Sequence, residues 1–139
     1  MIIRKATPKD SKEALVLVQE PSLTIDAEEY PDDELYFIES CESGVFFVAE
    51  ENDKVIGFIL GFKLTRSTYV LELIVVNNNI RGKGVGSKLL NKFREEISKL
   101  GATSYFLFSP DESKQTHQFY LKNGLKGGKK KMTMFFENI

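Results

Sequence analysis

The residues from Leu71 to Ser87 combine an apolar run, three asparagines and a glycine-rich stretch. The apolar run is rich in β-branched side chains, which favour a strand, and asparagines favour a turn. After the turn, apolar residues recur every three or four positions, which predicts a helix; they are Val85, Leu89, Phe93, Ile97 and Leu100. Gly101 follows, where a helix C-terminal cap is expected. The stretch therefore predicts a strand, a glycine loop and a helix in succession.

A glycine-rich turn that leads into a helix N-terminus can bind an anion. The first N–H groups of the helix have no partner inside it, and the helix dipole adds about half a positive charge there. Gly84 and Gly86 carry no side chain that would keep a phosphate away from the backbone, and Arg81 and Lys83 add positive charge. The pattern predicts a phosphate or diphosphate held by main-chain N–H groups.

Glu72 is the one charged residue in the apolar run from Val70 to Val76. Burying a carboxylate in a strand is costly unless the group is paired or functional. With a period of two, Glu72 shares a strand face with Ile74 and Val76. A carboxylate can take a proton from an amine, whose pKa near ~10 keeps it protonated at neutral pH. The alternative is a structural ion pair with Arg66 or Lys63.

Two common phosphate-binding motifs do not fit the loop. Counted from Gly82, both the dinucleotide pattern and the nucleoside-triphosphate pattern require a glycine where Ser87 stands. The pattern that is present is Arg-x-x-Gly-x-Gly, from Arg81 to Gly86, directly after an apolar strand and before an amphipathic helix. This arrangement resembles the coenzyme A loop of the GNAT family of N-acetyltransferases.

Two further segments resemble the same family, so the resemblance extends over most of the chain. The segment from Ile3 to Asp10 looks like the first strand and turn of the family, and Phe119 to Leu125 is similar to its Phe-Tyr-x-x-x-Gly-Phe signature. There are two departures. Leu125 replaces the usual final aromatic, and Ser113 stands seven residues before Tyr120, where many members have an asparagine.

The resemblance implies acetyl-CoA as the co-substrate. No metal is expected, because the sequence has no cluster of His, Cys and acidic residues with metal-ligand spacing. The loop would hold the diphosphate, and the preceding strand would offer backbone groups to the pantetheine arm, as an added strand would. The implied cofactor-binding residues are Ile74, Val75, Val76, Arg81, Gly82, Lys83, Gly84, Val85, Gly86, Ser87, Ser113 and Tyr120.

The resemblance also implies two catalytic residues. Glu72 would bind or deprotonate the acceptor amine, and Tyr120 would protonate the departing thiolate. A thiol with a pKa near ~8.5 leaves as an anion, to which a phenol can donate a proton. The alternative for Tyr120 is a half-buried aromatic that packs beside Phe119. His117, the only histidine, is expected to be a surface or packing residue.

The expected elements give an α/β (α+β) fold in a single domain, residues 1–139. A mixed, mostly antiparallel sheet with helices on both faces is predicted, and the resemblance adds a splay between the strands at about 68–76 and 104–109. Gly57 and Gly61 predict a bulge or a close backbone approach.

The expected strands are 2–6, 45–50, 55–63, 68–76, 104–109 and 132–136. The expected helices are 11–18, capped by Asp10 or Ser11, and 33–41, 85–100 and 111–123; the acidic segment 20–34 is expected to form mostly a loop.

The composition is that of an ordinary globular protein, with 42% hydrophobic and 28% charged residues and a net charge of −1. The single cysteine, Cys41, excludes an internal disulfide and a cysteine metal cluster. No secretory leader pattern follows Met1, and no apolar run approaches the ~20 residues of a membrane helix. These features predict a cytoplasmic protein that does not bind a membrane.

Charge is distributed unevenly along the chain. Residues 1–79 hold 7 Lys and Arg against 15 Asp and Glu, whereas residues 80–139 hold 12 against 5. This asymmetry suits an anionic cofactor and a cationic amine acceptor. The open alternatives are a non-catalytic acyl-CoA-binding regulatory module and an RNA-associated protein, although the overall charge argues against nucleic acid. The acceptor and the oligomeric state, a homodimer included, stay open.

Overall fold

The computed structural model describes residues 1–19, 33–133 and 135–139, so most of the predicted loop 20–34 lies outside the described residues. The chain divides into two compact units, Met1–Leu107 and Phe108–Ile139, and each is described by itself. The elements in chain order are β1 (Ile2–Lys5), η1 (Pro8–Asp10), α1 (Ser11–Val18), α2 (Glu34–Ser43), β2 (Val45–Glu51), β3 (Lys54–Lys63), β4 (Thr68–Val76), η3 (Asn78–Ile80), α3 (Val85–Lys99), β5 (Ser104–Phe106) and α4 (Lys114–Lys122).

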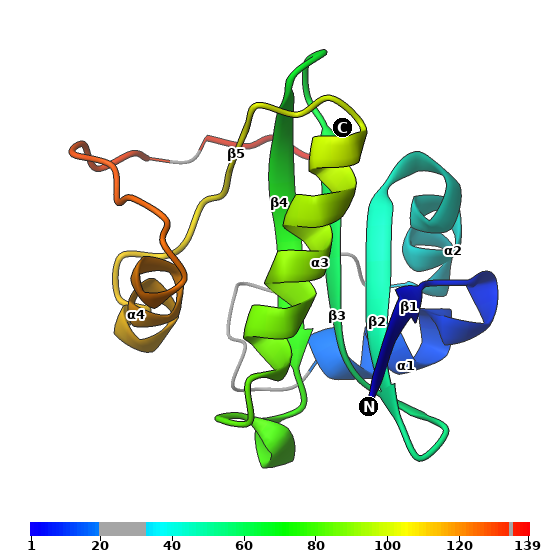
Figure 1. Ribbon diagram of the computed structural model, residues 1–139. Helices are drawn as coiled ribbons and strands as arrows, with labels where there is room; N and C mark the ends of the chain where they lie inside the picture. The colour runs from blue at the N-terminus through cyan, green and yellow to red at the C-terminus, as the bar shows by residue number, and fades with distance from the viewer. Residues whose placement is uncertain (20–32, 134) are drawn as a thin grey trace. The chain divides into compact units, whose positions relative to one another are not determined.

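The first unit is built on a five-stranded sheet in the order β1-β2-β3-β4-β5 (Figure 1). The neighbours from β1 to β4 pair antiparallel, and β5 pairs parallel to β4. Figure 1 shows α3 running along the sheet beside β3 and β4. The predicted mixed, mostly antiparallel sheet is confirmed.

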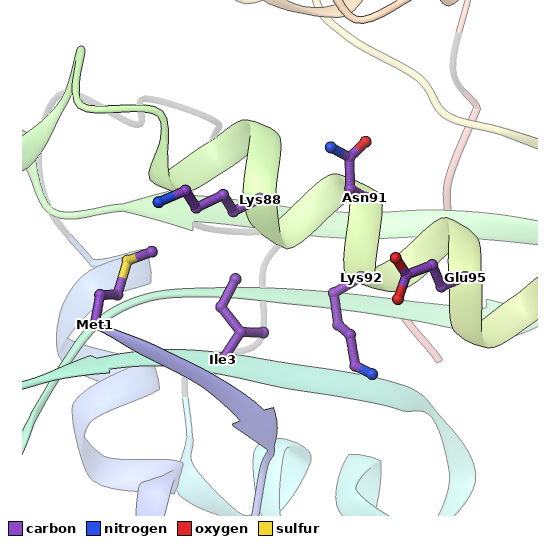
Figure 2. A pocket seen from close by; sticks show the side chains of 6 residues that line it. All are labelled: Met1, Ile3, Lys88, Asn91, Lys92 and Glu95. Atoms are coloured by element: carbon purple, nitrogen blue, oxygen red, sulfur yellow. The ribbon is translucent and has the colours of Figure 1, made fainter.

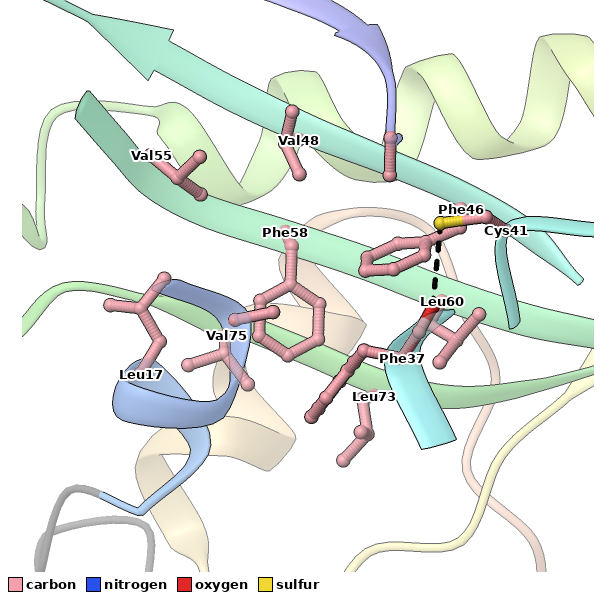
Figure 3. Packing of buried hydrophobic residues seen from close by; sticks show 12 residues of the cluster. Leu17, Phe37, Cys41, Phe46, Val48, Val55, Phe58, Leu60, Leu73 and Val75 are labelled. Atoms are coloured by element: carbon pink, nitrogen blue, oxygen red, sulfur yellow. Dashed lines mark hydrogen bonds between the residues drawn. The ribbon is translucent and has the colours of Figure 1, made fainter. Parts of the chain in front are cut away.

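Alternate residues of β3 face two different layers. Phe58 and Leu60 join a buried cluster with residues of α1 and α2, which Figure 3 shows around Phe37. Gly57 and Gly61, which flank them in the strand, face the other way: a Cβ on Gly57 would lie 3.4 Å from Leu89, and one on Gly61 would lie 2.6 Å from Phe93. Since Leu89 and Phe93 belong to α3, helices cover both faces, as predicted.

The turn between β2 and β3 and the glycines of β3 behave as their residue types predict. Asn52 and Asp53 have φ angles of 52° and 61°, which suits the tight turns of hairpins. Gly61 adjoins a register shift between β3 and β4. At Gly57 an added Cβ would lie 2.9 Å from the carbonyl oxygen of Val75. Both a bulge and a close backbone approach are therefore present.

Asp10 is the N-cap residue of α1, one of the two predicted alternatives, but its side chain makes no capping hydrogen bond to the helix. Its carboxylate accepts hydrogen bonds from the Thr7 N–H at 2.8 Å and from both terminal nitrogens of Arg4 at 2.8 Å. This partly buried pair ties β1 to the turn before α1. Hydrogen bonding from Arg4 lowers the pKa of Asp10, and the same bond raises the pKa of Arg4.

Two predicted boundaries and one predicted strand in the last third of the chain are wrong. Strand β5 ends at Phe106 rather than Ser109, shortly before Pro110, which lacks an N–H for a ladder. Helix α4 begins at Lys114, because the Ser113 N–H bonds to the Pro110 carbonyl in a turn and Ser113 has non-helical angles. The described residues of the expected strand 132–136 are not in a strand. Apolar residues favour a strand, but a strand also requires a paired neighbour.

Candidate active site

The turn after β4 is closed by its asparagines. The Asn77 side chain accepts a hydrogen bond from the Asn79 N–H at 2.9 Å, and the Asn77 carbonyl accepts one from the Ile80 N–H at 3.0 Å. The Arg81 Nε then donates to the carbonyl of Val76, the last residue of β4, at 3.2 Å. These bonds bring the loop directly from the strand end to the start of α3.

The N-terminus of α3 has the geometry of an anion site. Gly84 is the N-cap residue with φ of 80°, and no side chain caps the helix. The Lys88 N–H bonds to the Gly84 carbonyl at 3.1 Å, so the N–H groups of Val85, Gly86 and Ser87 precede the first helical hydrogen bond. Those three groups have no acceptor among the described residues.

The loop is open above its glycines. Gly82 and Gly84 both have positive φ angles, of 85° and 80°, and a Cβ built on either would meet nothing within 4 Å. Arg81 and Lys83 are exposed beside them. The residues that the sequence singled out thus form one glycine turn, with free N–H groups and positive charge, in which an anion could reach the backbone.

One edge of β4 is unpaired next to this loop. Pairing with β5 ends at Val70 and Phe106, so from Leu71 onward β4 has no partner strand on that side in the described part of the chain. The Asn77 N–H bonds to the Ile56 carbonyl at 2.9 Å, and backbone groups alternate in direction along a strand. The N–H and C=O groups of Ile74 and Val76 therefore point to the open edge. The predicted splay corresponds to the end of pairing.

Val75 is placed differently from its two neighbours. By the same alternation its backbone faces β3, where it lies opposite Phe58, and its side chain is buried in the cluster with α1 and α2. Its N–H and C=O groups are thus directed away from the open edge.

Glu72 occupies a β-bulge. Leu60 of β3 lies opposite Leu73, and the next residue, Gly61, lies opposite Leu71, so Glu72 is the extra residue of β4. The Glu72 side chain is exposed, and it has neither a hydrogen bond nor an ion pair within the described residues. The carboxylate is therefore not buried: burial alternates along β4, and Glu72 lies in the more exposed set with Val70, Ile74 and Val76.

Tyr120 and Ser113 belong to the second unit. Tyr120 is half-buried on α4, and its ring meets that of Phe119 edge-on at 5.3 Å. The Tyr120 carbonyl accepts a hydrogen bond from the Leu125 N–H at 3.1 Å, which closes the helix around Gly124. Ser113 is the N-cap residue of α4, and its carbonyl accepts a hydrogen bond from the His117 N–H at 3.0 Å.

Two other chemically reactive groups, Cys41 and Lys131, have partners within the described residues. The Cys41 thiol is buried and donates to the Phe37 carbonyl at 3.3 Å, which Figure 3 shows, and burial raises its pKa. A thiol with a raised pKa is a poor nucleophile at neutral pH. Lys131, from the basic run 129–131, forms an ion pair with Asp111 at 3.0 Å.

Neither a metal site nor a membrane-spanning helix is found in the part of the chain that the structure describes. Its His, Cys, Asp and Glu side chains do not gather in groups of three or more that could hold a metal ion. Its helices also lack the combination of length and apolar character that crossing a bilayer requires.

An open groove of about 310 Å³ lies between the start of the chain and α3 (Figure 2). It is lined by Met1, Ile3, Lys88, Asn91, Lys92 and Glu95. Lys92 is engaged by Glu96 at 3.5 Å and by the Phe47 ring, 5.3 Å from its centroid. Because β1 and β4 are separated by two strands in the sheet, the groove is distinct from the open β4 edge.

Comparison with known proteins agrees with this geometry. The sequence profile of the acetyltransferase (GNAT) family matches residues 13–125, which include the β4 edge, the loop and α4. The chain belongs to the GNAT acetyltransferase family. GNAT proteins generally use acetyl-CoA. No curated protein sequence gives a significant match.

Solved structures share the fold over nearly the whole chain. A putative acetyltransferase from Agrobacterium tumefaciens has a TM-score of 0.79 and 21% identity, over 98% of this chain and all of that one. A ribosomal-protein-alanine N-acetyltransferase from Brucella melitensis has a TM-score of 0.75 and 15% identity, over 98% and 100%. An aminoglycoside acetyltransferase from an uncultured soil metagenomic sample has a TM-score of 0.81 and 15% identity, over 99% and 96%.

Proposed function

We propose that this GNAT protein is an acetyl-CoA-dependent N-acetyltransferase that transfers the acetyl group to a primary amine by direct attack in a ternary complex. The observation that carries the proposal is the unpaired edge of β4 leading into a helix N-terminus whose first N–H groups are free. An extended ligand arm could form hydrogen bonds with the unpaired edge of β4, and a diphosphate at its end could accept hydrogen bonds from the free N–H groups of the helix.

The diphosphate would be bound by the backbone of the loop. The N–H groups of Val85, Gly86 and Ser87 would donate to its oxygens, with Arg81 and Lys83 supplying positive charge. Gly82 and Gly84 leave the approach open. The pantetheine arm would then lie along Ile74 and Val76, whose backbone groups point outward, and Val75 would have no direct contact with it through its backbone.

Glu72 would act on the acceptor amine. Its carboxylate is exposed at the bulge and has no competing partner among the described residues, which supports a role as base or amine anchor. An ammonium group cannot attack a thioester until it has lost a proton, which Glu72 would accept directly or through water. Tyr120 would donate a proton to the thiolate that leaves, with Ser113 as a further contact to the coenzyme. Acetyl-CoA supplies the activated acyl group.

The acceptor is proposed only as a primary amine, on a small molecule or a protein. Two structural relatives are named for acceptors of very different size, an alanine of a ribosomal protein and an aminoglycoside, and their identity to this chain is 15%. At that identity only the fold is shared. The acidic balance of residues 1–79 supports a cationic acceptor.

The test is a thermal-shift measurement with acetyl-CoA, followed by a thiol-release assay over a panel of polyamines, amino sugars, lysine peptides and peptides with free N-termini. We expect acetyl-CoA to raise the melting temperature and at least one amine to release coenzyme A. Stabilisation without release for any amine would instead identify a non-catalytic acyl-CoA-binding module. No stabilisation would contradict the proposed cofactor.

A further inference from the structure

The bulge at Glu72 changes which residues of β4 face the open edge. Before the bulge, the Thr68 carbonyl accepts a hydrogen bond from the Leu64 N–H at 2.9 Å, so Thr68 and, by alternation, Val70 face β3. Strict alternation from Val70 would also turn the backbone of Ile74 and Val76 toward β3. The extra residue at the bulge reverses which backbone groups face β3, so the backbone N–H of Asn77 bonds to β3 instead.

The bulge reverses the side-chain faces as well. Leu71 lies opposite Gly61, on the face that α3 covers, whereas Leu73 lies opposite Leu60, in the cluster with α1 and α2. Both residues are 4–5% exposed, so each has a buried site of its own. A strand without the bulge would move one of these two leucines out of its layer, and the register is therefore strongly specified.

Gly61 stands where the register between β3 and β4 shifts. A Cβ on Gly61 would lie 2.6 Å from two atoms of the Phe93 ring and 2.7 Å from the Val70 carbonyl oxygen. The ring therefore rests against the backbone of β3 beside the bulge. Phe93 is fully buried and meets Tyr105 of β5 edge-on at 5.6 Å. The Tyr105 hydroxyl in turn accepts a hydrogen bond from Arg94 at 2.9 Å.

We propose that Gly61 is a positioning residue for acetyl transfer: by admitting the Phe93 ring against β3, it fixes the bulge that presents Glu72. The inference rests on the proposed function, since it assigns to Gly61 control of the group that handles the acceptor. Gly61 itself would touch neither substrate. A methyl group there must displace the buried ring or the Val70 carbonyl, two residues from Glu72.

Gly61→Ala tests the proposal, with Gly44→Ala as the matched control. A Cβ on Gly44 would also be crowded, 2.8 Å from Leu60 Cδ1, but it lies at the end of α2, in the other layer. We expect Gly61→Ala to lower kcat by about a hundredfold, the order of loss that misplacing a reacting group can cause. The KM for acetyl-CoA should stay near wild type, and Gly44→Ala should retain kcat even if it melts at a similar temperature.

The double variant Gly61→Ala/Glu72→Gln separates positioning from a general loss of structure. If Gly61 acts through Glu72, Gly61→Ala should cause little further loss of kcat in the Glu72→Gln background. Fully multiplicative losses, or equal kcat values for Gly61→Ala and Gly44→Ala, would overturn the inference.

A measurement without turnover keeps the inference distinct from the proposed function. Backbone nuclear Overhauser effects in the wild type should show the pairings Gly61–Leu71 and Leu60–Leu73, and Gly61→Ala should lose the first of them. If no amine is acetylated by the wild type, the proposed function fails, and with it the role in transfer. If the pairing survives in Gly61→Ala, the role of Gly61 in the bulge is wrong whether or not the protein is an enzyme.

Discussion

At the residue scale, Gly84 is where a side chain would most directly oppose the proposed diphosphate. We expect Gly84→Asp to weaken coenzyme A binding by at least about a hundredfold, because two like charges about 4 Å apart repel by roughly 4 kcal/mol near a protein surface. Isothermal titration calorimetry measures the effect. Gly101→Asp is the matched control, since Gly101 also has positive φ, 96°, and open space around it, beyond the other end of α3. Equal affinities for the two variants would refute the loop assignment.

Glu72 is the residue whose exposure best fits a role in proton transfer. We expect Glu72→Gln to lower the rate at neutral pH by about 10²-fold or more, the contribution typical of a general base. The loss should shrink as the pH approaches the amine pKa, because the free amine then no longer needs the carboxylate. A pH–rate profile measures this change. The control is Glu51→Gln, since Glu51 is exposed at the end of the hairpin. An unchanged profile would make Glu72 structural.

Tyr120 is tested by removal of its hydroxyl alone. Tyr120→Phe keeps the ring that packs edge-on to Phe119, so the fold of α4 should be retained. We expect kcat to fall by about 10²-fold with little change in coenzyme affinity, because a general acid acts in the transition state. Steady-state kinetics with a fixed amine gives both values, and a wild-type kcat would leave Tyr120 with a packing role only.

The sequence identified most of these residues but not how the strand presents them. The glycines of the loop were predictable because their spacing and the helix after them have a direct physical meaning. The inward backbone of Val75 was not, since it depends on one extra residue in the β3–β4 register. Gly61 was the available signal: the sequence predicts a bulge or close approach there, but not which residue on the partner strand is the extra one.

At the element scale, β1 is tied to the turn before α1 by Arg4 and Asp10. The folded state lowers the pKa of Asp10, so its contribution to stability is present above the unfolded value near ~3.9 and is lost as the pH falls through the folded value. We expect Asp10→Asn to lose about 1–3 kcal/mol at neutral pH and to depend less on pH below about 5. Urea unfolding between pH 2 and 7 measures this.

Asp53→Asn is the control for that experiment, because Asp53 is exposed in the hairpin turn. It should leave both the stability at neutral pH and its decline in acid close to wild type. A parallel decline for wild type and Asp10→Asn would show that other carboxylates dominate the acid response.

The helices and strands that were predicted well are those whose sequence signals lie within the element itself. Strand β4 and helix α3 match their expected ranges closely, since each has a clear hydrophobic period and a turn or cap residue at its end. The hairpin of β2 and β3 follows from its turn residues in the same way. The described residues of the predicted strand 132–136 form no strand, because an apolar pattern contains no information about a pairing partner. Strand β5 ends at Phe106, shortly before Pro110, which lacks an N–H for a ladder.

At the scale of the whole molecule, the family profile spans both compact units, from α1 to the end of α4. The first unit holds the loop, the open β4 edge and Glu72, whereas Tyr120 and Ser113 lie in the second. The roles proposed above are therefore assigned to residues of both units. The fold class was predictable from the order of elements, but the acceptor was not, because a shared fold does not specify it.

The most direct test of the account is a titration of the ¹⁵N-labelled protein with coenzyme A, followed by NMR at the backbone amides. We predict the largest shifts at Val85, Gly86 and Ser87, with smaller shifts at Ile74 and Val76, since these N–H groups would gain acceptors. Shifts confined to the groove around Lys88 and Lys92 (Figure 2), with the loop amides unchanged, would contradict it.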